Sequence, residues 1–222
     1  MGEKGSGAKR IWIAVGVLIC LAMVTVSVVK QCDSAQKGGN ALVYSYNPFD
    51  YKSDVGYYIP QENENIFDDE EYLEKNRYFT VSYQGTTSAY TDDNIDSATL
   101  SLQMLYTYFD AAINGDGATL NTLFTDYYFD NLGSPIEKYD DSFYQQKIYN
   151  INVILHSGPT VIPSVSGNIT REIFQVSYYI KDNNGAFRPD LPEPEDGTIP
   201  LFFEVLTDDG EAKINQIFVY SE

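Results

Sequence analysis

"SATLSLQMLYTYFDAAINGDGATLNTLF", residues 97–124, predicts a long amphipathic helix, a sharp break and the start of a second helix. Apolar side chains recur there at steps of three and four, which places them on one face of the first helix. The members of this face are Ala98, Leu102, Leu105, Phe109 and Ala112, widened by Met104, Tyr108 and Ala111. The pair Asn114-Gly115 follows, and it is expected to end the helix because Gly and Asn tolerate a positive φ angle. So wide an apolar face needs a partner surface.

The ends of these helices carry further signals. Asp93, Asp96 or Ser97 is expected to cap the first helix, because such side chains accept hydrogen bonds from unpaired backbone N–H groups. Asp116 is expected to cap the second helix in the same way. A third helical segment is expected in "SPIEKYDDSFYQQKIY", residues 134–149.

From Tyr149 onward the apolar period changes to two, which is typical of β-strands. The alternating sets are Tyr149, Ile151, Val153 and Leu155; Phe174, Val176, Tyr178 and Ile180; and Leu201, Phe203 and Val205. The Asp-Gly of "TDDG", residues 207–210, then separates two β-rich runs, which predicts a hairpin. Helices therefore precede four or five antiparallel strands. The predicted fold class is α+β, with helices packed on one face of a curved antiparallel sheet.

Two segments resemble the nuclear transport factor 2-like superfamily, also called the cystatin-like cone fold. They are "LQMLYTYFDAAINGDGATLNTLFTDYYFD", residues 102–130, and "PLFFEVLTDDGEAKINQIFVYSE", residues 200–222. The resemblance covers residues 92–222 and implies a cone-shaped α+β roll. It implies little about activity, because this scaffold hosts enzymes, binding modules and structural subunits alike.

An apolar run lies close to the N-terminus. "IWIAVGVLICLAMVTVSVV", residues 11–29, contains no charged side chain, and as a helix it would be about 28 Å long, close to the roughly 30 Å of a bilayer's hydrocarbon core. A cleaved signal peptide is the alternative, but its apolar region is normally shorter and ends in small residues. We therefore expect a transmembrane helix that holds the chain in the lipid bilayer.

Charges flanking this run predict its orientation. Lys4, Lys9 and Arg10 precede the run; Lys30 and Lys37 follow it, and acidic sequence begins after them. Because positive charge favours the cytoplasmic side, we expect a single-pass protein of the cell membrane with its N-terminus in the cytoplasm and its C-terminal domain extracytoplasmic.

The chain is thus expected to have four parts. These are a cytoplasmic tail (1–10), a transmembrane helix (11–29), a partly ordered, acidic, Tyr-rich stalk (30–91) and a nuclear transport factor 2-like domain (92–222). Within the stalk, "YFTVSY", residues 78–83, is expected to add a strand to the domain or to pack on its surface. Cys32 lies just outside the predicted membrane helix, and the sequence leaves open whether it forms an intermolecular disulfide.

Composition and motifs limit the classes of function that the chain can have. Hydrophobic residues make up 43% of the chain, enough for a sizeable core, and the net charge of −18 argues against binding to nucleic acid. No motif predicts a catalytic residue, a cofactor or a metal site. Catalytic members of the resembled superfamily place an Asp or His base beside Tyr or Asp donors, and here the resemblance implies Tyr106, Tyr108, Asp110 and His156 as candidates. From the residues alone we expect core packing for Tyr108, solvent for Asp110 and a surface or local role for His156.

The expected function is a non-catalytic, membrane-anchored extracytoplasmic binding module of a bacterial envelope, with a protein partner there and with homo-oligomerisation left open. One alternative is an inner-membrane scaffold subunit of a conjugation or type IV secretion machine, which the layout of anchor and exported domain resembles. Another is a small-molecule-binding protein or pocket enzyme of the same fold. A deep open cavity where His156, a Tyr and an Asp converge would favour the pocket enzyme or small-molecule binder, whereas a pocket mouth plugged by aromatic residues, with an apolar patch outside, would favour assembly.

Overall fold

The computed structural model describes residues 43–45, 58–59, 64–130, 136–140, 142–164, 167–188 and 200–220. The chain divides into two compact units, Met1–Leu42 with Glu222, and Val43–Ser221. All described residues belong to the second unit. The predicted cytoplasmic tail and transmembrane helix lie outside the described residues, as does Cys32. Among the helices that the structure describes, none has the length and apolar character needed to cross a membrane.

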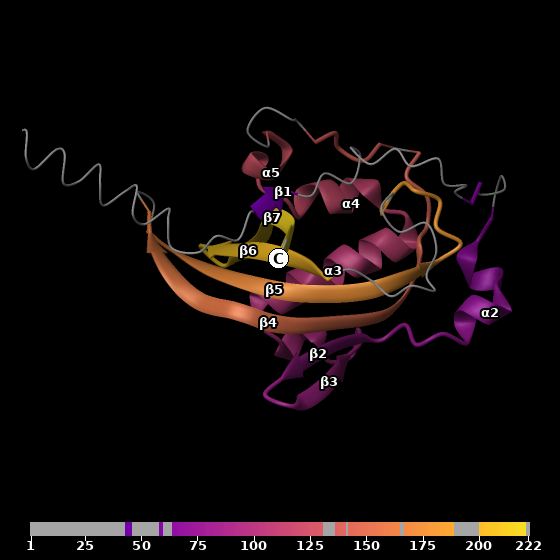
Figure 1. Cartoon of the computed structure of the whole chain (residues 1–222), viewed down its shortest axis with the longest axis horizontal. Helices are drawn as coiled ribbons and strands as arrows, with labels where there is room; N and C mark the ends of the chain where they lie inside the picture. The colour runs from indigo at the N-terminus through magenta and orange to yellow at the C-terminus, as the bar shows by residue number, and fades with distance from the viewer. Residues whose placement is uncertain are drawn as a thin grey trace, which may run out of the picture. The chain divides into compact units, whose positions relative to one another are not determined.

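In the described part of the chain, seven strands form one sheet in the order β1-β7-β6-β5-β4-β2-β3. They are β1 (Val43–Ser45), β2 (Phe79–Tyr83), β3 (Thr86–Tyr90), β4 (Lys147–Pro163), β5 (Asn168–Lys181), β6 (Leu201–Asp208) and β7 (Glu211–Tyr220). Figure 1 shows the long strands β4 and β5 curving side by side, with helix α3 (Leu100–Asn114) lying across the sheet. The predicted α+β class with a curved sheet is confirmed.

The prediction of a wholly antiparallel sheet is wrong. Strand β2 pairs with β4 in parallel, with Thr80 opposite Asn152, while the other neighbouring strands are antiparallel. Parallel neighbours need a long connection, and here the chain passes through β3 and the helices before it returns as β4. The segment 78–83 adds a strand, as predicted, so part of the predicted stalk belongs to the sheet.

The remaining elements are short. They are the 3-10 turns η1 (Ile66–Asp68) and η2 (Ile95–Ser97) and the helices α2 (Glu70–Leu73), α4 (Gly117–Thr122) and α5 (Asp126–Asp130). Helix α3 is capped by Thr99, whose hydroxyl accepts a hydrogen bond from Leu102 N at 3.4 Å. The predicted caps Asp93, Asp96 and Ser97 are therefore wrong, because the chain makes a 3-10 turn before the helix begins.

The break after α3 is confirmed. Gly115 has a φ angle of 72°, and a Cβ there would lie 2.8 Å from Gln145 N, so the position requires glycine both for its backbone angle and for space. Asp116 caps α4 as predicted, with its carboxylate accepting from Thr119 N at 2.9 Å. The β6–β7 hairpin is also confirmed, and positive φ angles of 47° at Asp209 and 84° at Gly210 match a type I′ turn.

The third predicted helix is wrong. Residues 136–140 and 142–146 are irregular, and β4 begins at Lys147. Other groups take the backbone hydrogen bonds that a helix would use. The Asn121 side chain of α4 donates to Tyr139 O at 2.8 Å and accepts from Tyr139 N at 3.0 Å, and Gln146 N donates to Ala112 O of α3. These hydrogen bonds hold the irregular segment against α3 and α4.

A bulge changes the predicted alternation in β4. Asn150 has a φ angle of 52°, and the register with β5 shifts between Tyr149 and Asn152. As a result Ile148 and Ile151 are both buried, whereas Tyr149 is only half-buried and stacks on Tyr179 with ring centroids 5.4 Å apart. Tyr149 therefore does not share the buried face of Ile151.

The core lies between α3 and the sheet. The predicted apolar face of α3 is confirmed from Leu105 onward, with Leu105, Phe109 and Ala112 at most 2% exposed. Leu102 is half-buried, and the prediction that Ala98 belongs to this face is wrong because the helix begins at Leu100. On the sheet, the predicted sets Phe174, Val176, Tyr178 and Ile180 of β5 and Leu201, Phe203 and Val205 of β6 are buried in the same cluster. This alternation fixes which face of each strand meets α3.

Candidate functional site

Tyr108 lies inside the core and is 3% exposed. Its ring centroid is 5.2 Å from that of Phe109, 5.4 Å from that of Phe203 and 6.0 Å from that of Phe124, each in an edge-to-face arrangement. Burial raises the pKa of the Tyr108 phenol well above its usual value. The expected core packing of Tyr108 is thus observed, and interlocked rings fill the space between α3 and the sheet.

Tyr106 and Asp110 lie on another side of α3. The Tyr106 hydroxyl donates to Asp92 Oδ1 at 2.8 Å, and its ring meets Phe79 edge-on at 5.6 Å. Burial, with the hydrogen bond to Asp92, raises the pKa of Tyr106. Asp110 is exposed at the surface; partial desolvation raises its pKa, while a hydrogen bond donated by Asn114 at 2.9 Å opposes this. Both residues line a small surface cavity of about 180 Å³.

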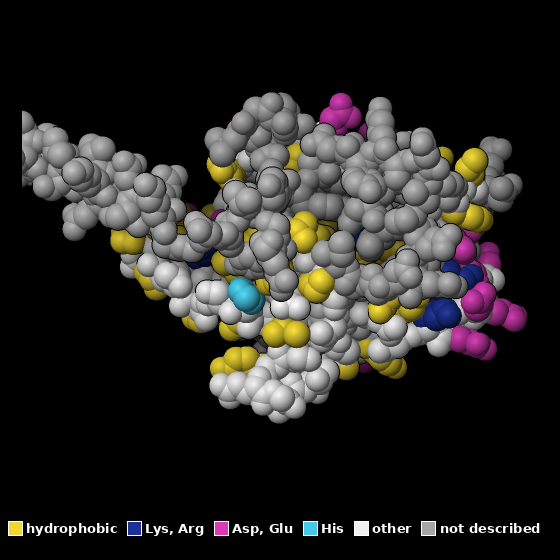
Figure 2. Space-filling model, in the orientation of Figure 1, with side chains coloured by type: hydrophobic (Ala, Val, Ile, Leu, Met, Phe, Trp, Pro, Cys, Tyr) yellow, Lys and Arg dark blue, Asp and Glu magenta, His cyan; other side chains and the backbone are white. Residues whose placement is uncertain are grey.

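His156 lies on the opposite face of the sheet. It is exposed, and its ring meets Phe202 edge-on at 5.0 Å (Figure 2, where the single histidine is cyan). Neighbouring residues of a strand point to opposite faces, and Phe203, the neighbour of Phe202, contacts Tyr108 in the core. The sheet therefore separates His156 from Tyr106, Tyr108 and Asp110, and the four catalytic candidates do not converge.

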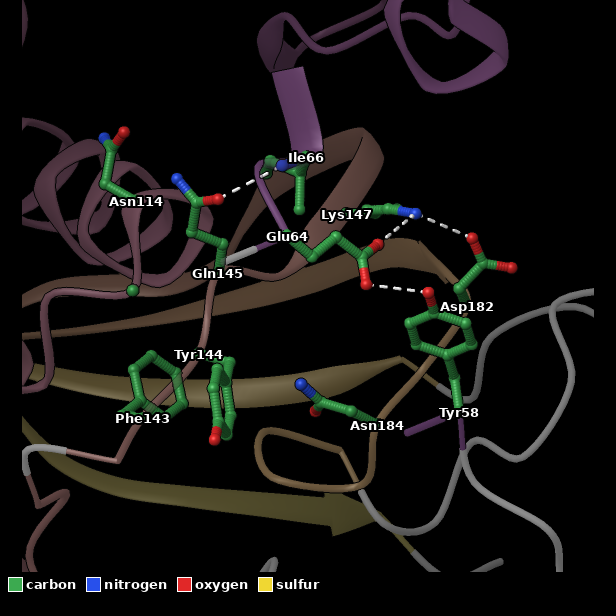
Figure 3. A pocket seen from close by; sticks show the side chains of 11 residues that line it. Tyr58, Glu64, Ile66, Asn114, Phe143, Tyr144, Gln145, Lys147, Asp182 and Asn184 are labelled. Carbon is green, nitrogen blue, oxygen red and sulfur yellow. Dashed lines mark hydrogen bonds and ion pairs between the residues drawn. The ribbon is translucent and has the colours of Figure 1, made fainter. Parts of the chain in front are cut away.

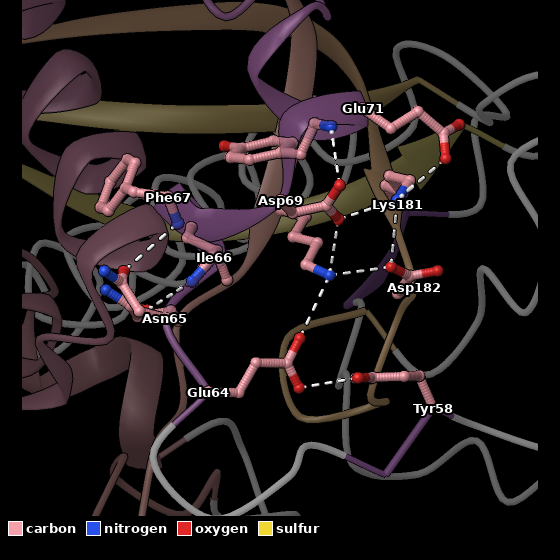
Figure 4. Close-up of polar contacts among 12 residues, drawn as sticks. Tyr58, Glu64, Asn65, Ile66, Phe67, Asp69, Glu71, Lys181 and Asp182 are labelled. Atoms are coloured by element: carbon pink, nitrogen blue, oxygen red, sulfur yellow. Dashed lines mark hydrogen bonds and ion pairs between the residues drawn. The ribbon is translucent and has the colours of Figure 1, made fainter.

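The densest group of charges lies where β4 and β5 meet the segment that precedes β2. We call it the ion cluster; its members are Lys147, Lys181, Glu64, Asp69, Glu71 and Asp182 (Figure 4). Lys147, with 7% of its side chain exposed, has its Nζ 2.9 Å from carboxylate oxygens of both Asp69 and Asp182. Glu64 lies 3.2 Å from the same nitrogen. Lys181 contacts Asp69 at 2.8 Å from the other side.

These contacts shift the pKa values of the cluster in opposite directions. Burial lowers the pKa of Lys147, but hydrogen bonds to Asp182, Asp69 and Glu64 outweigh it and raise the pKa above its usual value. Hydrogen bonds from Lys181 and Lys147 hold the pKa of Asp69 well below its usual value. The positive and negative side chains of the ion cluster therefore compensate mainly each other's charge.

Beside the ion cluster is a cavity of about 180 Å³ (Figure 3). Its polar lining is also bonded internally, since the Tyr58 hydroxyl donates to Glu64 at 2.7 Å and Gln145 accepts from Ile66 N at 3.1 Å. Lys147 lies 5.4 Å from the centroid of the Tyr58 ring, a cation–π contact. This arrangement fastens the segment before β2 to the sheet. Within the described ranges no group of His, Cys, Asp and Glu side chains is suited to a metal ion.

A larger cavity, of about 460 Å³, lies between the β2–β3 hairpin, the start of α3 and strands β4 and β5. We call it the hairpin groove. Its lining residues are Val81, Ser82, Tyr83, Gln84, Thr86, Ser88, Tyr90, Thr99, Leu102, Leu155, Glu172 and Phe174. The hairpin pairs Phe79 with Tyr90 and Val81 with Ser88, so alternate residues share the face that looks toward α3. Phe79 is 2% exposed and belongs to the core, whereas Ser88 is exposed in the groove.

Glu172 supplies the charge of the hairpin groove. Its carboxylate accepts a hydrogen bond from the Ser101 hydroxyl of α3, and Ser101 is itself 2% exposed. Glu172 precedes Phe174 by two residues, so it continues the inward-facing alternation of β5. Sequence reasoning missed Glu172, although a carboxylate at an inward register position was a usable signal.

Comparison of the chain with protein-family models, with curated proteins and with solved structures finds no match. The resemblance to the nuclear transport factor 2-like superfamily therefore stays a prediction.

Proposed function

We propose that the chain is a non-catalytic binding module, held outside a bacterial cell membrane by a single-pass anchor at residues 11–29. The observation that carries the proposal is the filled space between the middle of α3 and the sheet; the hairpin groove, at the start of α3, is lined by none of the four catalytic candidates. Interlocked rings such as Tyr108, Phe109 and Phe203 occupy the space between α3 and the sheet. Enzymes of the resembled superfamily use that space for a buried acid–base pair, which needs a cavity that perturbs its pKa values.

The arrangement of the catalytic candidates supports the same proposal. His156 contacts Phe202 on one face of the sheet, while Tyr106 bonds Asp92 on the other side of the molecule's core. A general base must lie within hydrogen-bond reach of the proton that it removes. Because the four catalytic candidates lie apart and the charges of the ion cluster pair with one another, the domain offers surfaces for contact more readily than a site for proton transfer.

The order of helices and strands supports the proposed fold, and the N-terminal sequence supports the proposed location at the cell membrane. Helices α3, α4 and α5 precede the antiparallel strands β4 to β7, which agrees with the order that the resemblance implies. The uncharged run 11–29 is long enough for a membrane helix, and the acidic remainder of the chain fits the extracytoplasmic side. The same layout fits the alternative that the chain is an inner-membrane scaffold subunit of a conjugation or type IV secretion machine, in which case its partners are other subunits of that machine.

Cross-linking in native membranes, followed by mass spectrometry, tests this function. We expect cross-links between exposed positions of the domain and extracytoplasmic segments of other envelope proteins. Recovery of conjugation or secretion subunits would assign the chain to such a machine. A chain that stays monomeric and gives no intermolecular cross-link would contradict an interaction role.

A further inference from the structure

We propose that the hairpin groove binds a small organic cation, an ammonium group carried on an apolar body, with Glu172 as its counter-ion. This inference rests on the binding function proposed above and adds the site and the chemical class of the ligand. It follows from three properties of the groove, namely its walls, its charge and its size.

The walls of the groove are mainly apolar. Leu102 of α3, Leu155 of β4 and Phe174 of β5 contribute apolar surface, and Val81 and Tyr83 of the hairpin face them. Polar lining groups are mostly the hydroxyls of short side chains. A ligand that buries apolar surface here gains roughly 25 cal/mol for each Å² removed from water. The groove therefore suits a ligand whose body is aliphatic or aromatic.

The charge of the groove is a carboxylate with little internal compensation. The Glu172 carboxylate accepts a hydrogen bond from the Ser101 hydroxyl. Among the described residues, no Lys or Arg forms an ion pair with Glu172. Another glutamate of the sheet, Glu204, provides a contrast, since Arg171 and Asn215 donate to it at 2.5 Å and 2.7 Å. An ionised carboxylate has about four acceptor positions, so Glu172 retains capacity for a donor that enters the groove.

The position of Glu172 favours a ligand that carries its charge at one end. The carboxylate shares the inward face of β5 with Phe174, so a cation that meets Glu172 has its apolar body beside Phe174 and Leu155. A volume of about 460 Å³ also lies in the range of about 300–1,000 Å³ that is typical of small-molecule sites. An anionic ligand would instead meet the repulsion of Glu172.

Ligand binding to the full chain in phosphatidylcholine nanodiscs tests this inference, with empty nanodiscs as the blank. The probe is phenethylammonium, and phenethyl alcohol and hydrocinnamate are its neutral and anionic counterparts. Saturation-transfer NMR is expected to detect phenethylammonium with a Kd on the order of 1 mM or tighter, as suits so small a ligand. We expect weaker binding of the alcohol and none of the carboxylate.

Two pairs of variants locate the site. Glu172→Gln keeps the shape of the side chain and its acceptor for Ser101, and it is expected to weaken phenethylammonium binding about tenfold or more, because a charge-assisted hydrogen bond is lost. Glu211→Gln, a change at a side chain that is 79% exposed outside the groove, is expected to leave binding unchanged. Ser88→Trp fills the groove and is expected to abolish phenethylammonium binding. Thr87→Trp places the same side chain on the opposite face of the hairpin and is expected to leave binding unchanged.

Melting curves of all four variants distinguish loss of the site from loss of the fold. The inference is overturned if phenethylammonium does not bind, if hydrocinnamate binds as well, or if folded Glu172→Gln and Ser88→Trp proteins bind like the wild type. Such a result leaves the cross-linking test of the proposed interaction function unaffected. Conversely, if the domain binds phenethylammonium but forms no intermolecular cross-links, the ligand site is supported and only the proposed protein partner is contradicted.

Discussion

Phe109→Ala is expected to lower the free energy of unfolding by about 3–5 kcal/mol, the usual cost of removing a buried aromatic side chain. Phe109 is 2% exposed on the inner face of α3. Its ring lies 5.1 Å from Tyr178 of β5, 5.2 Å from Tyr108 and 6.1 Å from Phe79 of β2. One side chain therefore joins α3 to two strands, and its loss leaves a cavity that surrounding rings cannot easily fill.

Chemical denaturation monitored by circular dichroism measures this change. Phe109→Leu keeps most of the apolar volume and is expected to cost about 1 kcal/mol. Tyr78→Ala, at an aromatic residue that is 59% exposed, is expected to change stability by less than about 0.5 kcal/mol. Equal losses for Phe109→Ala and Tyr78→Ala would contradict a core built on interlocked rings between α3 and the sheet.

Lys147→Met is expected to destabilise the domain by about 2–4 kcal/mol, because removing one partner leaves buried charge uncompensated. Three carboxylates, from Glu64, Asp69 and Asp182, lie within 3.2 Å of Lys147 Nζ. After the change, Lys181 is the remaining cation beside Asp69 and Asp182, and Asp69 also keeps the hydrogen bond from Tyr72 N. Partial exposure of these carboxylates keeps the expected loss below the roughly 3–5 kcal/mol that is typical of breaking a fully buried pair.

A matched control separates the ion cluster from charge in general. Lys213→Met removes a lysine whose side chain is 44% exposed and whose carboxylate partner is 3.8 Å away, so its expected cost is below about 0.5 kcal/mol. Urea unfolding of both variants provides the comparison. Similar stabilities would show that the ion cluster does not hold the segment before β2 on the sheet.

The same cluster predicts how stability depends on pH. The folded-state pKa of Asp69 lies below its ordinary value of 3.8, so the unfolded chain binds the proton more readily. Its contribution is therefore complete well above pH 4 and is lost as the pH falls through about 4 toward the folded-state pKa. Asp69→Asn is expected to flatten this acid dependence, and Lys147→Met to reduce it in part, because Lys181 still bonds Asp69.

Local signals account for the elements that the sequence predicts correctly. The spacing of Leu105, Phe109 and Ala112 defines the helix face, Gly115 its end, and Asp209-Gly210 the last hairpin. Each of these is decided within a few residues of chain. For the same reason the alternation of β5 and β6 predicted their buried faces.

Contacts between distant segments account for what the sequence could not predict. The parallel pairing of β2 with β4 joins residues about 70 positions apart, and the Asn121–Tyr139 bonds that replace the predicted helix depend on how α4 packs. Lys147 and Glu172 belong to the same class. Glu172 occupies an inward strand position, whereas Lys147 lies on the face opposite that of Ile148, and the partners of both become known only when the chain is folded.

Accessibility of a single cysteine on intact cells tests the central claim most directly. Glu211→Cys places a thiol at a position where the native side chain is 79% exposed, in a chain whose Cys20 and Cys32 are replaced by Ser; Ser6→Cys marks the predicted cytoplasmic tail. With a membrane-impermeant maleimide, the account predicts full labelling of Glu211→Cys on intact cells, recovery of the labelled chain with the membranes, and labelling of Ser6→Cys only after lysis. Protection of Glu211→Cys until lysis, or recovery of the labelled chain in the medium, would contradict an anchored extracytoplasmic module.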